Sequence, residues 1–264
     1  MTPKFRFAHT AALAVGTMLT LTGLPKQAHA DTSRTPVLVE LFTSEGCSSC
    51  PPADALLSSL VRRQPVPGAL IIALGEHVDY WDGNGWRDPF SSHALTVRQN
   101  DYAASFHNDT VYTPQMVVDG RTEFVGSDDS KVSAAIAHAA RTPKAQVTIA
   151  PDAQPDTFTV SVHDLPTLAS GDAADVYLAV TEDGLRSHVA RGENAGRTLT
   201  HVAVVRSLEK LGTVRAGETF SVQHRLASSP KGQAGSQNVL VFVQARASRR
   251  VLGAALASRT ASAG

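Results

Sequence analysis

The sequence predicts an α/β domain followed by an antiparallel β-sandwich domain. In residues 35–141, short apolar runs alternate with longer stretches of helical periodicity, which is typical of a sheet covered by helices. After Pro143 the pattern changes to short runs rich in β-branched residues, separated by Pro, Gly, Ser and Asp. We therefore expect residues 31–142 to form the first domain and residues 143–264 the second.

The first thirty residues have the pattern of a secretory signal peptide. Lys4 and Arg6 precede an apolar stretch over residues 11–24, and residues 28–30 (Ala-His-Ala) form a small-x-small cleavage site. The stretch is shorter than the roughly 20 apolar residues that a spanning helix needs, and no later segment is apolar enough to span a bilayer. We expect cleavage before Asp31, giving a periplasmic or secreted protein without a membrane span.

The charge balance speaks against two classes of partner, nucleic acid and anionic lipid. Residues 1–30 hold three basic and no acidic residues, so the 24 basic and 24 acidic residues of the chain become 21 and 24 after cleavage. Nucleic acid and anionic lipid would each require a clustered excess of Lys and Arg. We therefore expect a small-molecule or protein partner and no nucleic acid.

The first domain is predicted to contain six elements. In chain order these are a buried strand (37–42), a helix beginning near Pro51 or Pro52, a second strand (69–74), a helix (89–106), a hairpin (115–118 and 122–125) and a last helix capped by Ser127. This order resembles that of the thioredoxin fold. The resemblance implies that Thr113-Pro114, just before the hairpin, is a cis-proline loop that faces the cysteines.

The second domain is predicted to be a sandwich of about six to eight short strands. The strand candidates are residues 147–149, 158–162, 176–180, 201–205, 220–222 and 239–243. Gly192-Glu193-Asn194-Ala195-Gly196 is interpreted as a tight connection between strands, in which glycine supplies positive φ.

The chain has two cysteines, Cys47 and Cys50, only three positions apart. A disulfide between residues so close contributes little chain-entropy stabilisation, so its chemistry is the better reason for the pair. Three uses are open: a redox-active disulfide, binding of a soft metal such as Cu(I), and an inert disulfide.

The two thiols are expected to differ. Cys47 ends a loop that contains Gly46, so we expect it to be the partly exposed nucleophile, with Cys50 drawn under the surface as the resolving thiol. Pro51 and Pro52 disfavour a helical conformation at the preceding residue. The helix could therefore begin one turn late, which would leave Cys47 farther from its dipole and less acidic.

Glu40 is a charged residue inside an apolar strand, seven positions before Cys47. A buried acid near the site could accept a proton from Cys50, as a similarly placed acid does in thioredoxins. A structural role as an edge-facing or hydrogen-bonded glutamate is the alternative, because a buried carboxylate needs a partner in either case.

The loop over residues 76–82 follows the second predicted strand and should lie beside the cysteines, because ligand sites form at that end of parallel strands. We assign His77, Asp79, Tyr80 and Trp81 to substrate binding, together with Thr113 and Pro114. A packed surface loop is the alternative.

Five segments make the sequence resemble a family of secreted bacterial proteins catalogued as domain of unknown function 1223 and described as thioredoxin-like. They are residues 41–54 (LFTSEGCSSCPPAD), 78–82 (VDYWD), 85–90 (GWRDPF), 112–120 (YTPQMVVDG) and 192–196 (GENAG). The family name implies no activity. The residues predict a thiol-disulfide oxidoreductase that acts on protein thiols or disulfides without a metal or cofactor; the alternatives are a Cu(I) carrier and a non-enzymatic binding protein with a structural disulfide.

Overall fold

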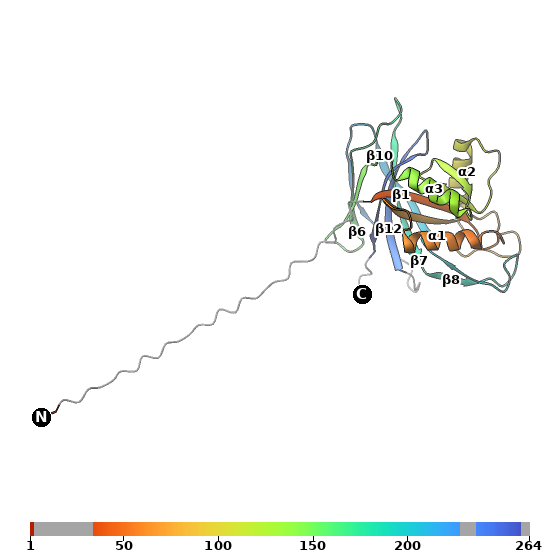
Figure 1. Cartoon of the computed structure of the whole chain (residues 1–264), viewed down its shortest axis with the longest axis horizontal. Helices are drawn as coiled ribbons and strands as arrows, with labels where there is room; N and C mark the ends of the chain where they lie inside the picture. Colours follow the sequence, from red (N-terminus) through yellow and green to blue (C-terminus); the bar gives the residue numbers. More distant parts are fainter. Residues whose placement is uncertain (3–33, 228–235, 260–264) are drawn as a thin grey trace. The chain divides into compact units, whose positions relative to one another are not determined.

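Strand β1 (Thr35–Thr43) is buried on both faces because helices cover it from both sides (Figure 1). Val37, Val39 and Leu41 pack in one core cluster with helices α1 (Pro51–Arg63) and α3 (Asp129–Ala139). Successive side chains of a strand point to opposite faces. Leu38 and Phe42 accordingly pack on the other side, where helix α2 (His93–Phe106) contributes Leu95 and Tyr102. The coordinates are a computed structural model that describes residues 1–2, 34–227 and 236–259.

A large mixed sheet of eight strands runs through the fold. Its order is β13-β12-β7-β10-β2-β1-β3-β4. The strands besides β1 are β2 (Ala69–His77), β3 (Gln115–Val118), β4 (Thr122–Val125), β7 (Ala174–Asp183), β10 (Val204–Val214), β12 (Ser236–Ala245) and β13 (Val251–Ser258). β1 pairs in parallel with β2 and antiparallel with β3.

The large sheet contains strands from both sides of residue 142, where the sequence predicts a domain boundary. β10 lies beside β2, with Val204 opposite Gly75, and the Gly75 N–H donates to the Ala203 carbonyl at 2.7 Å. A Cβ on Gly75 would lie 3.0 Å from the Val202 carbonyl oxygen, so glycine allows this approach. Residues 34–142 and the later strands therefore share one sheet, and Ser33–Gly264 is one compact unit.

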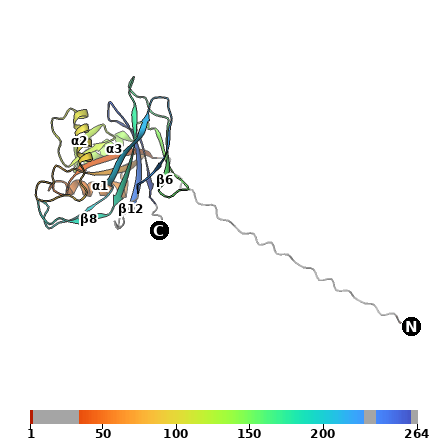
Figure 2. The ribbon, with the colours of Figure 1, turned by 180° about the vertical axis from the view of Figure 1, so that it is seen from behind.

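A smaller antiparallel sheet packs against strands β7, β12 and β13 of the large sheet (Figure 2). It consists of β5 (Gln146–Pro151), β6 (Thr157–His163) and β11 (Phe220–Arg225). Val160 and Val162 of β6 share a core cluster with Val176 and Leu178 of β7, so this part has sandwich-like packing. Two further strands, β8 (Leu185–His188) and β9 (Thr198–His201), pair with each other and with no other strand of the described residues.

Several predicted elements need correction. α2 begins at His93 rather than residue 89, because Asp82 accepts the Asp88 N–H and the Ser91 hydroxyl and holds the chain in turns. α3 is capped by Asp128, not Ser127: its Oδ1 accepts the Lys131 N–H at 3.1 Å.

Further corrections concern the strands. The strand predicted over residues 201–205 is broken by Ala203, which has a φ of 52°. β8 and β13 were not predicted; β13 is rich in Ala and Gly, which are depleted in strands.

None of the helices in the described ranges is long and apolar enough to cross a bilayer. The predicted signal peptide, residues 1–30, lies outside these ranges apart from its first two residues.

Candidate functional site

Cys47 and Cys50 form a disulfide between the end of β1 and the start of α1. Cys50 is the N-cap residue, and its carbonyl accepts the Ala53 N–H at 2.9 Å. The expectation of a late helix is wrong: α1 begins at Pro51, because proline at the first helical positions needs no hydrogen-bond acceptor and has a helical φ.

Neither sulfur is accessible in this disulfide. Cys47 and Cys50 each have 0% of their surface exposed, although Ser48 and Ser49 between them are exposed. The prediction of a partly exposed Cys47 is therefore corrected. Residues far along the chain hydrogen-bond the loop that carries Cys47, and the local pattern around Gly46 does not contain them.

Gly192, Glu193 and Asn194, here called the cover segment, lie over the cysteine loop. Glu193 Oε2 accepts the Ser48 N–H at 2.9 Å, and this bond holds the pKa of the Glu193 carboxyl below its ordinary value. The fully buried side-chain amide of Asn194 donates to the Glu45 and Cys47 carbonyls, both at 2.9 Å. The segment belongs to the connection between β8 and β9, as the predicted tight connection requires, with Gly192 at a φ of 80°.

The Thr113-Pro114 bond is cis, as predicted. Trp81 links it to the disulfide loop: its indole N–H donates to Thr113 Oγ1 at 2.8 Å, and its Cβ would lie 3.1 Å from a Cβ on Gly46. The structure thus brings the predicted residues Trp81, Thr113 and Pro114 close to the cysteine loop.

Glu45, two residues before Cys47, organises the buried surroundings of the site. Its carboxylate accepts hydrogen bonds from the Trp86 indole N–H at 2.8 Å and from the Ser187 hydroxyl, and it lies 3.0 Å from His201 Nε2. Ser187 and His201 belong to β8 and β9, so one carboxylate ties both strands to the cysteine loop.

His77 lies beneath the same loop and is paired with Asp88. Its Nδ1 is 2.7 Å from Asp88 Oδ2, which also accepts the Glu45 N–H at 2.8 Å. Burial lowers the pKa of His77, but the Asp88 carboxylate, together with Asp54 and Glu45, raises it by more, so its pKa lies above the ordinary value. Burial likewise raises the pKa of Asp88, but His77, together with the Glu45 and Phe90 N–H groups, more than offsets this and leaves its pKa below normal.

Asp54 is the carboxyl group on the first turn of α1. Residues four apart on a helix lie on one face, so Asp54 is on the same side as Cys50, whose carbonyl accepts its N–H at 3.1 Å. Burial raises the pKa of Asp54, and nearby His201 and His77 offset only part of that effect.

Glu40 is placed away from this group. Its neighbours Val39 and Leu41 face α1, so Glu40 points to the opposite face, where its Oε1 accepts the Arg98 Nε–H at 2.8 Å. Its Oε2 accepts the Tyr102 hydroxyl at 2.5 Å. These contacts fit the structural alternative rather than proton transfer with Cys50.

Glu76 shares Arg98 with Glu40. Arg98 Nε is 3.3 Å from Glu76 Oε1, and all three side chains are buried. Burial raises the pKa of Glu76 well above its ordinary value; Arg98 opposes this shift and Glu40 adds to it. One guanidinium therefore lies between two buried carboxyl groups.

Asp79 and Tyr80 contact α2 rather than the cysteines. Asp79 accepts the Thr96 hydroxyl at 2.5 Å and lies 3.1 Å from His93 Nδ1, and the Thr96 bond lowers the pKa of Asp79. The Tyr80 hydroxyl donates to Gln99 at 3.2 Å, and 38% of the Tyr80 surface is exposed. In the described ranges neither has a polar contact with Cys47 or Cys50.

Sequence reasoning missed several residues around the disulfide: Glu45, Asp54, Asp88, Glu193, Asn194 and His201. Their signal was partly visible, because Glu45 and Asp54 lie in the cysteine motif and Glu193-Asn194 in the glycine-flanked motif. What the sequence does not contain is the contact between those motifs, which lie about 145 positions apart.

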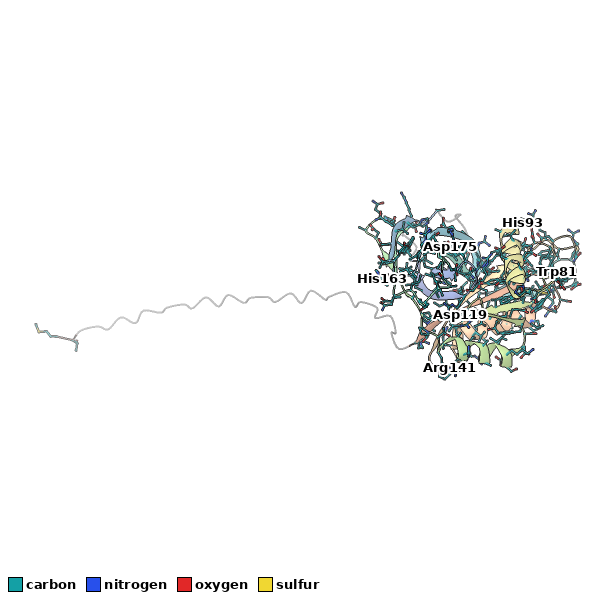
Figure 3. The ribbon with its side chains drawn as sticks, turned by 90° about the horizontal axis from the view of Figure 1, so that it is seen from above. Trp81, His93, Asp119, Arg141, His163 and Asp175 are labelled. Carbon is teal, nitrogen blue, oxygen red and sulfur yellow. A yellow bond between two sulfur atoms is a disulfide. The ribbon has the colours of Figure 1, made fainter. Side chains whose placement is uncertain are left out.

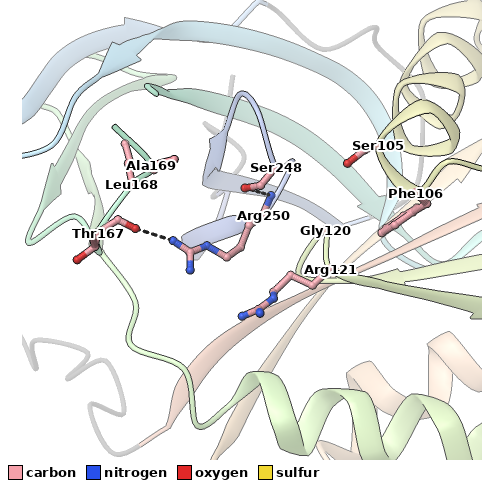
Figure 4. A pocket seen from close by; sticks show the side chains of 9 residues that line it. All are labelled: Ser105, Phe106, Gly120, Arg121, Thr167, Leu168, Ala169, Ser248 and Arg250. Atoms are coloured by element: carbon pink, nitrogen blue, oxygen red, sulfur yellow. Dashed lines mark hydrogen bonds between the residues drawn. The ribbon is translucent and has the colours of Figure 1, made fainter. Parts of the chain in front are cut away.

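A separate cavity of about 560 Å³ lies elsewhere, between the turn after β3 and the turn between β12 and β13 (Figure 4). Its lining includes Arg121 and Arg250, and Arg250 donates to the Thr167 carbonyl at 2.9 Å. Gly120 also lines this cavity. In Figure 3 its neighbour Asp119 lies near the middle of the folded part, whereas Trp81, beside the cysteine loop, lies at one edge. The cavity contains none of the predicted site residues.

Among the residues that the structure describes, no group of three or more His, Cys, Asp or Glu side chains is arranged to hold a metal ion.

The family profile described as "protein of unknown function (DUF1223)" matches residues 38–244. The chain belongs to this family. None of the curated proteins compared with it matches. Among solved structures, a protein from Agrobacterium tumefaciens is similar, with 24% identity, a TM-score of 0.67 and coverage of 87% of this chain and 96% of that one. HBP35 of Porphyromonas gingivalis is also similar, with 16% identity, a TM-score of 0.57 and coverage of 85% and 75%. At these identities the likeness shows the fold alone.

Proposed function

We propose that this DUF1223 protein is an exported thiol-disulfide oxidoreductase with a thioredoxin-like unit over residues 35–141. The observation that carries the proposal is the Cys47–Cys50 disulfide at the start of α1, linked through Trp81 to the cis Thr113-Pro114 loop. The local strand order β2-β1-β3-β4, with α1 and α3 on one face and α2 on the other, supports the thioredoxin-like assignment.

The proposed reaction is two successive thiol-disulfide exchanges with a protein substrate. In the reducing direction, the Cys47 thiolate attacks a substrate disulfide, forms a mixed disulfide and releases one substrate thiolate. The Cys50 thiolate then attacks Cys47 Sγ and releases the second substrate thiolate. Two electrons pass to the substrate, and the protein is left with its disulfide; the oxidising direction is the reverse.

Proton transfer with Cys50 is assigned to Asp54 in place of Glu40. Asp54 lies on the same helical face as Cys50, and burial raises the pKa of its carboxyl; in the oxidising direction, where Cys50 leaves as a thiolate, the protonated Asp54 donates to it. The substrate backbone is expected to dock against the Thr113-Pro114 segment in an extended conformation. His77 is assigned a positioning role through Asp88, and Tyr80 a place at the rim.

Trapping of mixed disulfides in living cells tests this proposal. A Cys50→Ser variant lacks the resolving thiol and should accumulate mixed disulfides with its substrates, whereas Cys47→Ser and the double variant should not. If Cys50→Ser traps nothing and the reduced native protein binds Cu(I) tightly, the carrier function replaces the oxidoreductase. If neither occurs, the disulfide is structural.

Export is tested separately. Mass analysis of the protein from the cell envelope should find Asp31 as the first residue, and retention of residues 1–30 would contradict the signal peptide.

A further inference from the structure

The cover segment hydrogen-bonds two backbone groups of the cysteine loop, which Trp81 links to the Thr113-Pro114 segment proposed to dock the substrate. The Ser48 N–H is bound by the Glu193 carboxylate, and the Cys47 carbonyl by the Asn194 amide. An extended polypeptide pairs through its own carbonyl and N–H groups, so it needs one such donor and one such acceptor. In the structure both are already taken.

The disulfide held in this loop is inaccessible, and the Cys47 sulfur lies 3.3 Å from the Ser49 hydroxyl of the same loop. Ser48 and Ser49 are exposed, yet neither Cys47 nor Cys50 has any exposed surface. Thiol-disulfide exchange requires a thiolate to approach a sulfur atom directly. The disulfide therefore cannot react while the cysteine loop keeps this closed arrangement.

The cover segment is carried by a small two-stranded unit, β8 and β9, whose side-chain links to the cysteine loop run through Glu45. β8 and β9 form a two-stranded sheet that pairs with no other strand in the described ranges. Two-stranded sheets are marginally stable in isolation, and locally weak units open well below the free energy of global unfolding. In addition, the Glu193 side chain lies at the surface, so its hydrogen bond to the Ser48 N–H is exposed to solvent.

We propose that the cover segment is an intramolecular competitor of the substrate, and that its displacement admits an extended polypeptide carrying the reacting cysteine. This proposal rests on the oxidoreductase function above and specifies its regulation. The substrate exchanges its own carbonyl and N–H for the Glu193 and Asn194 contacts. Small thiols gain no such contacts, so they react only in the fraction of time that the segment is open.

The test is the second-order rate constant for reduction of the native disulfide by dithiothreitol, measured by acid quench, thiol labelling and mass analysis. Glu193→Ala and Asn194→Ala should each raise it about threefold to tenfold, because each removes a hydrogen bond that holds the closed state. Glu218→Ala is the matched control: its exposed carboxylate also accepts a backbone N–H, from Arg215 at 2.9 Å, but in the turn before β11.

The result that overturns the proposal is equal rates for Glu193→Ala, the control and the native protein. Thermal unfolding separates opening from general loss of stability, because Glu193→Ala should react faster while its Tm stays that of Glu218→Ala. The outcome is independent of the trapping experiment. If the variants are reduced faster but no partner is trapped, the role of the cover segment is supported and the oxidoreductase function is refuted. If partners are trapped but the reduction rates are unchanged, the oxidoreductase function is supported and the role of the cover segment is refuted.

Discussion

Arg98 lies between two buried carboxyl groups, Glu40 and Glu76, and burial raises the pKa of Glu76 well above its ordinary value. Glu40 contacts the guanidinium at two nitrogens, whereas Glu76 contacts it only at Nε, at 3.3 Å. Removing the charged partner of a buried pair leaves an uncompensated charge, which commonly costs about 3–5 kcal/mol. A carboxyl group that is already protonated resembles an amide in shape and charge.

The two glutamates should therefore respond differently to the same substitution. Glu40→Gln should lower the free energy of unfolding by about 2–4 kcal/mol, because Glu76 can ionise and recover part of the loss. Glu76→Gln should change it by less than about 1 kcal/mol. Urea unfolding at neutral pH measures both, and equal losses would refute the unequal roles of the two carboxyl groups.

His77 gives a prediction about pH. Its folded pKa lies above the ordinary value of about 6.5, so its contribution to stability is complete below that pH and is lost as the pH rises through the folded pKa. In an Asp88→Asn variant, burial remains while the main opposing charge is gone. The pKa of His77 should then fall, which NMR titration of its imidazole can follow; an unchanged value would contradict the role of Asp88.

At the scale of single elements, α1, the hairpin and the strands around β1 could be predicted because apolar periodicity, prolines and the Asp119-Gly120 turn are local signals. β8, β13 and the sharing of one sheet could not. Pairing between β2 and β10 depends on the surfaces that the two halves present to each other. The same reason explains the site: the cysteine motif was identified, but its contact with Asn194 is not local.

Two turns from distant parts of the chain meet closely at Gly120. A Cβ there would lie 2.0 Å from the Arg249 carbonyl oxygen, and Gly120 has a φ of +64°. Gly171 has a φ of +78°, but nothing lies within 4 Å of such a Cβ. Substituting Gly171 therefore measures only the free-energy cost of a positive φ for alanine, without a steric clash. Gly120→Ala should therefore cost at least about 1 kcal/mol more than Gly171→Ala in thermal unfolding. Equal costs would mean that the turns are not packed together.

At the scale of the whole molecule, contacts of three kinds join residues 34–142 to the rest. The first is the backbone bond between Gly75 and Ala203. The second is a side-chain bond, in which Arg98 Nη1–H donates to Gln244 Oε1 at 3.1 Å. The third is the contact of Ser187 and His201 with the Glu45 carboxylate. Burial without these partners would leave polar groups unsatisfied.

Residues 34–142 expressed alone should therefore lack the stability of the full chain. We expect no cooperative thermal transition by near-ultraviolet circular dichroism, while the chain from residue 31 to 264 shows one. A cooperative transition of the fragment near the Tm of the full chain would instead establish residues 31–142 as an independent domain.

The central claim, that the Cys47–Cys50 pair is redox-active, is tested most directly by its reduction potential. The native protein is equilibrated in graded redox buffers, and the reduced fraction is measured by thiol labelling and mass analysis. The account predicts a reversible two-electron transition between about −120 and −270 mV, the range of known oxidoreductases, with the fold retained. A pair that stays oxidised below about −300 mV, or is reduced only when the protein unfolds, is a structural disulfide and would contradict the account.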